Sequence, residues 1–265
     1  DRTRDGVVVG EGAAVVLLVA FVLREARAAQ PLVPLRIFRS RNLSGANAIQ
    51  ALMVAGMYGM FFLGALYLQK VLGFDSLEVG LGFIPVTAII GTLSLGFSAK
   101  LNMRFGARAT LLPGLVFVAA GLALFSRITV DGSYWTEVLP SMVLVGIGAG
   151  LSFPSVMTLA MTGVRPEEAG LASGLVNTTL QVGGALGLAV LATLSTSRTS
   201  NLVSGGESTA SALTSGYQLA FVVGAALVLG AVVIAATVLR SSPPAEEAVA
   251  VEAAEAEPAF SSEAA

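Results

Sequence analysis

The strongest constraint on the fold of this chain is a series of long apolar stretches that contain no Asp, Glu, Lys or Arg. They occupy residues 44–69, 79–99, 109–126, 138–164, 169–197 and 208–239. A membrane-spanning helix needs about 20 mostly apolar residues, so each stretch can hold one such helix. Strands of a membrane β-barrel would be about ten residues long and would alternate in polarity, unlike these stretches. The sequence therefore predicts an all-α integral membrane protein. The number and near-regular spacing of the stretches argue against buried helices of a large soluble protein.

A weaker seventh stretch covers residues 6–23 and carries one acid, Glu11, near its start. We expect residues 1–26 to form one extra membrane helix ahead of the other six. The chain starts at Asp1 rather than Met, and apolar residues follow almost at once. Seven spans also place residue 1 outside, which is unusual for the start of a complete membrane protein of this type. We therefore expect this chain to be the C-terminal part of a longer protein.

The composition excludes several classes of function. The 265 residues include no Cys and no His, which removes disulfides, thiol nucleophiles, Cys/His zinc sites and His-based acid–base catalysis. A net charge of -2 gives no general attraction to nucleic acid. The segment GIGAG at 146–150 lies within an apolar stretch, so it lacks the strand that precedes a dinucleotide-binding loop. We expect no enzyme, no cofactor, no metal site and no nucleic-acid partner.

Positive charge sets the expected orientation in the membrane, because loops rich in Lys and Arg stay in the cytoplasm. Taken alternately, one set of loops holds ten of the 15 Lys and Arg residues and includes 24–43, 100–108 and 165–168. We expect these loops and the C-terminus to be cytoplasmic, in a multi-pass protein of a bacterial-type inner (plasma) membrane. Residues 27–43 then form a basic cytoplasmic linker. Residues 241–265, with six Glu and no Lys or Arg, form a disordered acidic tail.

Two of the apolar stretches carry polar and aromatic side chains on one helical face. In 44–69 a spacing of three and four residues defines such a face, with Tyr58 beside it; its members are Asn47, Gln50, Val54, Met57 and Phe61. In 169–197, Asn177 and Gln181 continue a four-residue repeat that starts at Ser173. Polar groups at membrane depth are costly and often functional, and Met and aromatic groups suit apolar ligands. The predicted substrate-cavity residues are Asn47, Gln50, Tyr58, Phe61, Asn177 and Gln181. Hydrogen bonding and packing between helices is the alternative.

Glycine pairs four residues apart predict close contacts between helices, because small residues let membrane helices approach each other. The pairs are Gly146 with Gly150 and Gly183 with Gly187. The same contacts are compatible with helices that slide or rock against each other during transport.

Four segments resemble the major facilitator superfamily, in particular its fourteen-helix drug:proton antiporter branch. They are PLVPLRIFRSRN (31–42), LYLQKVLGFDSLEVGLGFIPV (66–86), VGIGAGLSFPSV (145–156) and EEAGLASGLVNTTLQVGGALGLAV (167–190). The resemblance implies a major facilitator fold, in which residues 44–240 are the C-terminal six-helix half and one linker helix precedes them. It also implies that four helices lie beside a central cavity (44–69, 77–99, 138–161 and 170–196) and that two lie outside it (109–127 and 214–239).

The function implied by this resemblance is proton-coupled efflux of small apolar or amphipathic compounds. Its expected partners are the lipid bilayer, a small-molecule substrate, protons and the missing N-terminal half of the same transporter. A proton relay needs an ionisable group within the membrane, and none of the six stretches contains one at depth, so the coupling acid is expected outside this chain. A facilitator-fold importer of small metabolites and a truncated, non-transporting membrane protein are the alternatives.

The loop KLNMRFGAR (100–108) is similar to the signature loop of the superfamily, in which an Asp precedes Arg-x-Gly-x-Arg. Arg104, Gly106 and Arg108 match this pattern, but Met103 stands where the Asp is expected. The loop therefore looks like the degenerate second-half copy of the motif. The resemblance implies that the two arginines meet phosphates or the other half, and that Gly106 permits the tight turn. The first-half arginine motif and the Gly-Pro of the antiporter motif are absent.

Overall fold

The computed structural model describes residues 20, 24, 37 and 40–239. The chain divides into two units, residues 1–40 and residues 41–265, and the helices described here all belong to the second. The expected extra helix at 1–26, most of the linker at 27–43 and the tail at 241–265 lie outside the described residues.

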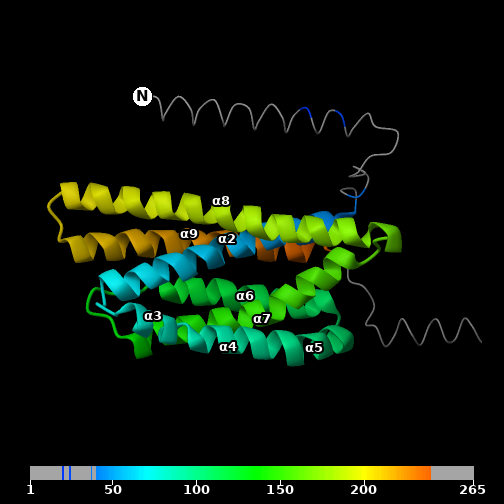
Figure 1. Ribbon diagram of the computed structural model, residues 1–265, viewed down its shortest axis with the longest axis horizontal. Helices are drawn as coiled ribbons and strands as arrows, with labels where there is room; N and C mark the ends of the chain where they lie inside the picture. Colours follow the sequence, from blue (N-terminus) through cyan, green and yellow to red (C-terminus); the bar gives the residue numbers. More distant parts are fainter. Residues whose placement is uncertain (1–19, 21–23, 25–36, 38–39, 240–265) are drawn as a thin grey trace, which may run out of the picture. The chain divides into compact units, whose positions relative to one another are not determined.

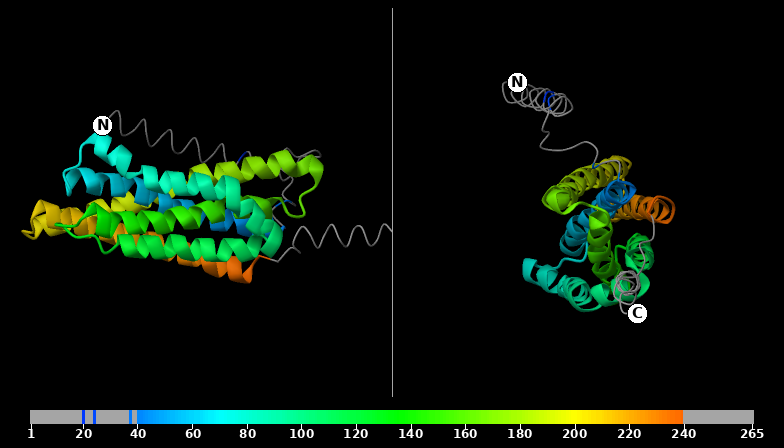
Figure 2. Two further views of the ribbon diagram at one scale, coloured as in Figure 1. Left: turned by 90° about the horizontal axis from the view of Figure 1, so that it is seen from below. Right: turned by 90° about the vertical axis from the view of Figure 1, so that its right-hand side faces the viewer.

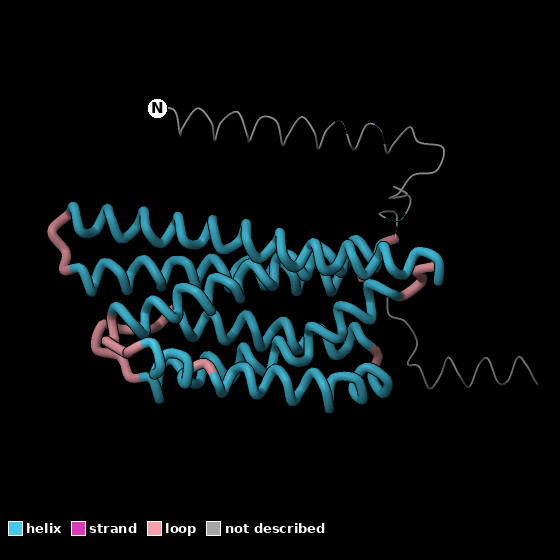
Figure 3. Tube along the Cα trace, in the orientation of Figure 1, coloured by secondary structure: helices cyan, strands magenta, loops and turns pink. Residues whose placement is uncertain are grey.

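The described part of the second unit consists of helices joined by short turns (Figure 3). Its elements are α2 (Arg41–Lys70), α3 (Ser76–Gly82), α4 (Ile84–Thr92), a π-helical turn (Leu93–Phe97), α5 (Ser98–Phe105), α6 (Ala107–Phe125), a second π-helical turn (Tyr134–Val138), α7 (Leu139–Met161), a 3-10 turn (Pro166–Glu168), α8 (Ala169–Ser204) and α9 (Thr209–Thr237). Helices α3 to α5 follow one another as one span, Ser76–Phe105. Counted in this way, six helices of the described region are long and apolar enough to cross a membrane, as the sequence predicts.

The helices run up and down, so the turns gather at the two ends of the bundle. Figure 1 shows the turns after α2, α6 and α8 at one end, and the turns after α5 and α7 at the other. The first of these ends carries Lys70 and the second carries Arg104 and Arg108. At the second end, Gly106 has φ 84°, a conformation that favours glycine, and it allows α6 to start directly after α5.

The six spans form two sets of three in chain order, and the two sets interleave. The first set is α2, Ser76–Phe105 and α6, and the second is α7 with its preceding π-helical turn, α8 and α9. Helix α2 packs against α8 and α9, and α7 packs against α6 and α4. The first helix of each set thus contacts the last two helices of the other set, while α6 and α9 also touch. The end-on view in Figure 2 shows α2 between α8 and α9, in agreement with these contacts.

Small residues bring the helices together in this arrangement. A Cβ added to Gly148 of α7 would lie 2.5 Å from the carbonyl oxygen of Gly114 in α6. Since real Cβ atoms essentially never come within 3.0 Å of other heavy atoms, α6 and α7 can be this close only because both positions lack a side chain. The contact between α2 and α9 is less tight, since a Cβ on Gly56 would lie 3.1 Å from the oxygen of Gly224 and would require a shift of a few tenths of an ångström.

Two of the spans are much less covered than the others. In the most apolar window of each helix, 61% of α2 and 61% of the Tyr134–Met161 span are buried, but only 17% of Ser76–Phe105 and 22% of Pro166–Ser204. The uncovered faces are apolar: Leu95 is 90% exposed and Leu186 is 63% exposed. The bundle therefore leaves the sides of α4 and α8 open to a membrane or to another protein surface.

Candidate functional site

An open groove lies between α2 and α8. It is lined by Tyr58, Phe61, Phe62 and Ala65 of α2 and by Leu188 of α8, and its volume is about 440 Å³. The two outermost rings, Tyr58 and Phe62, are four residues apart and therefore lie one above the other on the same side of α2. Behind them Phe61 packs on Phe83, with ring centroids 5.5 Å apart.

Helix α8 leaves room for the first of these rings. A Cβ on Gly184 would lie 2.5 Å from Cδ2 of Tyr58, so only glycine fits beneath the ring. Tyr58 remains 39% exposed and presents its outer surface to the groove. The groove is thus an aromatic surface that can receive flat or flexible apolar groups by stacking and by van der Waals contact.

The amides predicted for the cavity on α2 lie in its contact with α8 instead of in the groove. Gln50 is 3% exposed, and its Nε2 donates to the carbonyl oxygen of Val176 over 3.3 Å. Asn47 donates to the oxygen of Leu43 at 2.8 Å, and its Oδ1 accepts from the hydroxyl of Thr179 at 2.7 Å. Their geometry therefore matches the interhelical hydrogen bonding that was the alternative prediction.

The amides predicted on α8 are exposed. Asn177 Nδ2 donates to the carbonyl oxygen of Ser173 one turn earlier, at 3.1 Å, and Gln181 is exposed. Gln181 precedes Leu188 by seven residues, so the two side chains lie on nearly the same face of the helix. The structure thus brings Tyr58 and Phe61 together, leaves Asn177 and Gln181 on the face of α8 that continues from the groove, and separates Asn47 and Gln50 from both.

The predicted glycine pairs lie at two different helix contacts. On α8, a Cβ on Gly183 would lie 2.8 Å from Cα of Ala51, and one on Gly187 would overlap Ala55. On α7, a Cβ on Gly150 would lie 2.7 Å from Cβ of Leu93, and one on Gly146 would lie 3.2 Å from Cβ of Ile89. The first pair thus packs on α2, beside the groove, and the second pair packs on α4 and the π-helical turn that follows it.

The two arginines of the 100–108 loop have different surroundings. Arg108 donates from Nε to the oxygen of Ala235 at 3.2 Å and from Nη2 to the oxygen of Ala236, so it binds two carbonyls in the last turn of α9. A cation at this position is also favoured by the negative end of the helix dipole. Arg104 is exposed, and its guanidinium lies 5.3 Å from the centre of the Phe105 ring. Arg108 therefore joins α6 to α9, whereas Arg104 faces outward.

Sequence reasoning did not single out a row of polar contacts between the second span and α7. Ser94 and Ser98 donate to the oxygens of Gly150 and Leu151, both at 3.2 Å, and Ser155 donates to Oδ1 of Asn102 at 2.9 Å. The signal was present, because Ser94, Ser98 and Asn102 are spaced by four residues and share one helical face. These contacts hold α7 against a helix whose backbone regularity is interrupted by the π-helical turn at Leu93–Phe97.

Acidic side chains do not gather at depth in the described spans. Between residues 40 and 239, the acids lie at helix ends or in turns, namely Asp75, Glu78, Asp131, Glu137, Glu167, Glu168 and Glu207. Within that same region, no group of three or more His, Cys, Asp or Glu side chains could hold a metal ion. The candidate site is therefore an apolar and aromatic groove with amide groups beside it, which suits the binding and selection of a ligand.

In the described region, six helices of membrane-spanning length in two interleaved sets, with an aromatic groove between α2 and α8, define a multi-pass membrane protein. The sequence matches the family model of the Major Facilitator Superfamily over residues 7–188. The chain belongs to this superfamily, and thus to a group of membrane transporters and not of enzymes.

Curated relatives give the same assignment. The chain is 34% identical over 224 residues to the puromycin resistance protein of Streptomyces alboniger, a match that covers 84% of the chain and 44% of the relative. It is 37% identical over 232 residues to the cephamycin export protein of Amycolatopsis lactamdurans, which covers 86% of the chain and 46% of the relative. The chain thus spans about half the length of the curated relatives it matches.

A solved structure of a proton-dependent oligopeptide transporter shares the fold. It superposes with a TM-score of 0.66 at 19% identity, over 82% of this chain and 46% of that one. At this identity the likeness concerns the fold alone. The predictions of a major facilitator fold and of a chain that is not an enzyme are confirmed.

Proposed function

We propose that the chain is the C-terminal half of a secondary active efflux transporter, which exports small apolar or amphipathic compounds in exchange for protons. The observation that carries this proposal is the groove lined by Tyr58, Phe61 and Phe62 between two helices of a major facilitator fold. Two further facts support it. The relatives at 34% and 37% identity are a resistance protein and an export protein, and the lining of the groove has fewer charged and polar residues than a sugar or organic-acid importer would need.

A second half is the proposed partner of the open faces of α4 and α8. These faces expose apolar side chains such as Leu95 and Leu186, and an N-terminal half of similar size would bury them and close the groove into a cavity. The match to about half of each relative supports this arrangement. The proposed transporter alternates access by rocking the two halves about that cavity.

The proposed orientation puts the end with Arg104 and Arg108 in the cytoplasm of the cell, together with the C-terminus. The proposed coupling acid lies in the N-terminal half, because the described spans carry their acids only at helix ends or in turns. The bilayer in question is the inner (plasma) membrane of a bacterial-type cell.

The proposal is tested by ethidium efflux from cells that express the complete transporter. Tyr58→Ala removes a groove ring, and an aromatic contact is worth roughly two- to tenfold in affinity. We expect the efflux rate to fall by that factor. Phe117→Ala on α6 is the matched control, since Phe117 is 37% exposed, close to the 39% of Tyr58, and lies outside the groove.

The result that would overturn the proposal is an unchanged rate for Tyr58→Ala, at equal membrane abundance, with ethidium and with other dyes. An Asn177→Ala, Gln181→Ala double variant tests the exposed amides in the same assay. If that variant exports every dye normally, these amides have no part in substrate binding.

A further inference from the structure

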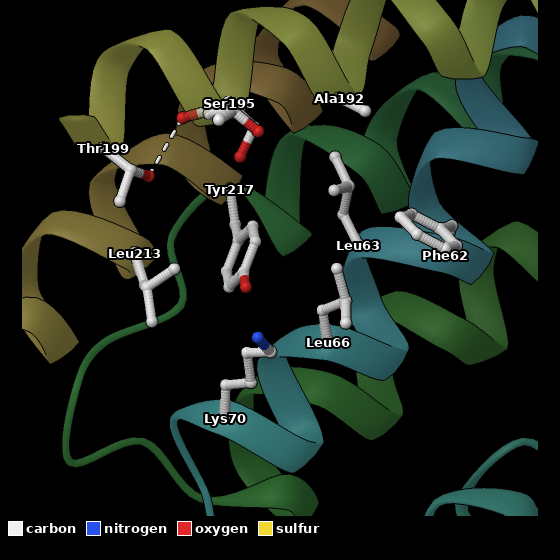
Figure 4. A pocket seen from close by; sticks show the side chains of 10 residues that line it. Phe62, Leu63, Leu66, Lys70, Ala192, Ser195, Thr199, Leu213 and Tyr217 are labelled. Carbon is white, nitrogen blue, oxygen red and sulfur yellow. Dashed lines mark hydrogen bonds between the residues drawn. The ribbon is translucent and has the colours of Figure 1, made fainter.

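A second cavity lies at the end of the bundle where α2 ends and α8 turns into α9. Its volume is about 190 Å³. Helices α2, α8 and α9 all contribute to the lining, which comprises Phe62, Leu63, Leu66, Lys70, Ala192, Ser195, Thr196, Thr199, Leu213 and Tyr217. The lining is mainly apolar, and it also includes several hydroxyl groups and the amino group of Lys70, which is an exposed residue (Figure 4).

Tyr217 is the most informative of these residues. Its side chain is 3% exposed, and among the described residues its hydroxyl has no hydrogen-bond partner. Figure 4 shows the ring reaching into the cavity, with its hydroxyl directed toward the amino group of Lys70. The ring is buried, but the hydroxyl oxygen is accessible from the cavity, so it can donate a hydrogen bond to a ligand atom there.

The polar groups around this position are mostly donors. Lys70 offers an ammonium group with three N–H donors and Tyr217 offers an O–H. Ser195, 3% exposed, contributes another hydroxyl. Thr199 already donates, to the oxygens of Ser195 and Ala212 at 2.9 and 3.2 Å. No carboxylate belongs to the lining, so the cavity favours a negative group and repels a positive one.

The cavity is adjacent to the aromatic groove. Phe62 lines both of them. On α8, the side chains that face this path recur at helical spacing from the exposed amides to the cavity, in the order Asn177, Gln181, Leu188, Ala192, Ser195 and Thr199. An extended molecule could therefore lie along one face of α8, with its apolar part in the groove and one end at Lys70.

We propose that Lys70 and Tyr217 bind the anionic group of an amphipathic anion whose apolar part lies against Phe62 and Tyr58. The inference rests on the proposed function and adds amphipathic anions, compounds with one negative group and an apolar body, to the substrates of the groove. A hydrogen bond from a charged donor such as Lys70 is stronger than one between neutral groups.

The experiment compares three ligands that share a naphthalene ring: 2-naphthoate, trimethyl(2-naphthyl)ammonium and 2-naphthamide. Their binding to the full chain in phosphatidylcholine nanodiscs is measured by equilibrium dialysis, with empty nanodiscs subtracted. We expect 2-naphthoate to bind at least about tenfold more tightly than the other two, as expected for a hydrogen bond to a charged group. Equal binding of the cation or of the amide would overturn the proposal.

Variants locate the site. Lys70→Gln should weaken 2-naphthoate binding by about tenfold or more, and Tyr217→Phe, which removes one neutral donor, by about fivefold. Lys70→Arg keeps the charge and should restore most of the affinity, which separates lost binding from lost folding. Arg198→Gln, with the same charge change on a residue of α8 that does not line the cavity, should alter affinity by less than about twofold. If Lys70→Gln and Tyr217→Phe bind 2-naphthoate as the unmodified chain does, the proposal fails.

The source of the anion is distinguished by the membrane. If nanodiscs that contain phosphatidylglycerol abolish 2-naphthoate binding while phosphatidylcholine nanodiscs support it, the cavity holds a lipid headgroup and the cargo assignment is wrong. The binding assay requires no transport. If the chain binds 2-naphthoate through Lys70 but the complete transporter shows no efflux, the anion site stands and the proposed function is refuted. Efflux that depends on Tyr58 without any anion preference refutes only the further inference.

Discussion

The contact between α2 and α8 is the part of the bundle most sensitive to a single methyl group. Gly183→Ala would put a Cβ 2.8 Å from Cα of Ala51. The obstructing atom belongs to the backbone, so no side chain can rotate away, and α8 must move outward by roughly half an ångström to reach the 3.4 Å of ordinary contact. Gly174→Ala on the same helix is the matched control, because its Cβ would meet nothing within 4 Å.

The two substitutions should shift stability in opposite directions. Overpacking costs about 1–3 kcal/mol, and the better helix propensity of alanine returns less than about 1 kcal/mol, so Gly183→Ala should lose about 1 kcal/mol. At roughly 2–4 °C per kcal/mol for a chain of this size, Tm falls by about 2–4 °C. Gly174→Ala gains only the better helix propensity of alanine, so its Tm should stay constant or rise slightly.

The assay is thermal unfolding followed by helical circular dichroism in dodecyl maltoside. The same variants are then compared in ethidium efflux, where Gly183→Ala should also lower the rate, because the groove lies along this contact. Equal Tm values for the two variants would refute the reasoning, since they would mean that α2 and α8 are not packed as closely as the structure indicates.

Three further predictions concern single side chains. Asn47→Leu removes two hydrogen bonds between and within helices, and we expect a loss of about 1 kcal/mol, measured as a fall in Tm of about 2–4 °C. Arg108→Ala deprives the last turn of α9 of two donors and should lower the free energy of unfolding by about 1–2 kcal/mol. The corresponding fall in Tm is measured in the same way, and an unchanged Tm would contradict the contact. Arg104→Ala should leave Tm unchanged and lower efflux modestly through topology or gating, so that a loss of substrate binding at normal insertion would count against this role.

The six membrane helices of the described region were predictable in number and approximate position, because charge is excluded from the bilayer core and the six uncharged stretches have the required length. The ends were less predictable. Helix α8 continues to Ser204, beyond the predicted end at 197, because Arg198 and the polar residues after it extend the helix out of the membrane. At 1.5 Å per residue its 36 residues span about 54 Å, well over the roughly 30 Å hydrocarbon core.

Helical periodicity predicted which residues share a face but not what covers that face. Asn47, Gln50 and Phe61 lie on one side of α2, yet α8 lies over the first two and leaves the third beside a groove. Only the path of α8 decides between hydrogen bonding and ligand contact, and that path depends on glycines whose partners are far away in the sequence. The cavity at Lys70 was beyond sequence reasoning for the same reason, since Tyr217 reaches it from α9.

The α2–α8 contact and the α4–α7 contact occupy equivalent places in the two sets of helices, but they differ in the hydrogen bonds that accompany them. Both α2–α8 and α4–α7 are close contacts that depend on a pair of glycines. The contact of α7 with the rest of the same span, the π-helical turn and α5, is bridged by hydroxyl hydrogen bonds from Ser94, Ser98 and Ser155. The α2–α8 contact has amide hydrogen bonds only toward its Arg41 end and continues as an open aromatic groove. A ligand can therefore enter between α2 and α8 without breaking buried hydrogen bonds, whereas entry between α7 and the Ser76–Phe105 span would leave polar groups unpaired at membrane depth, where each unmade bond is costly.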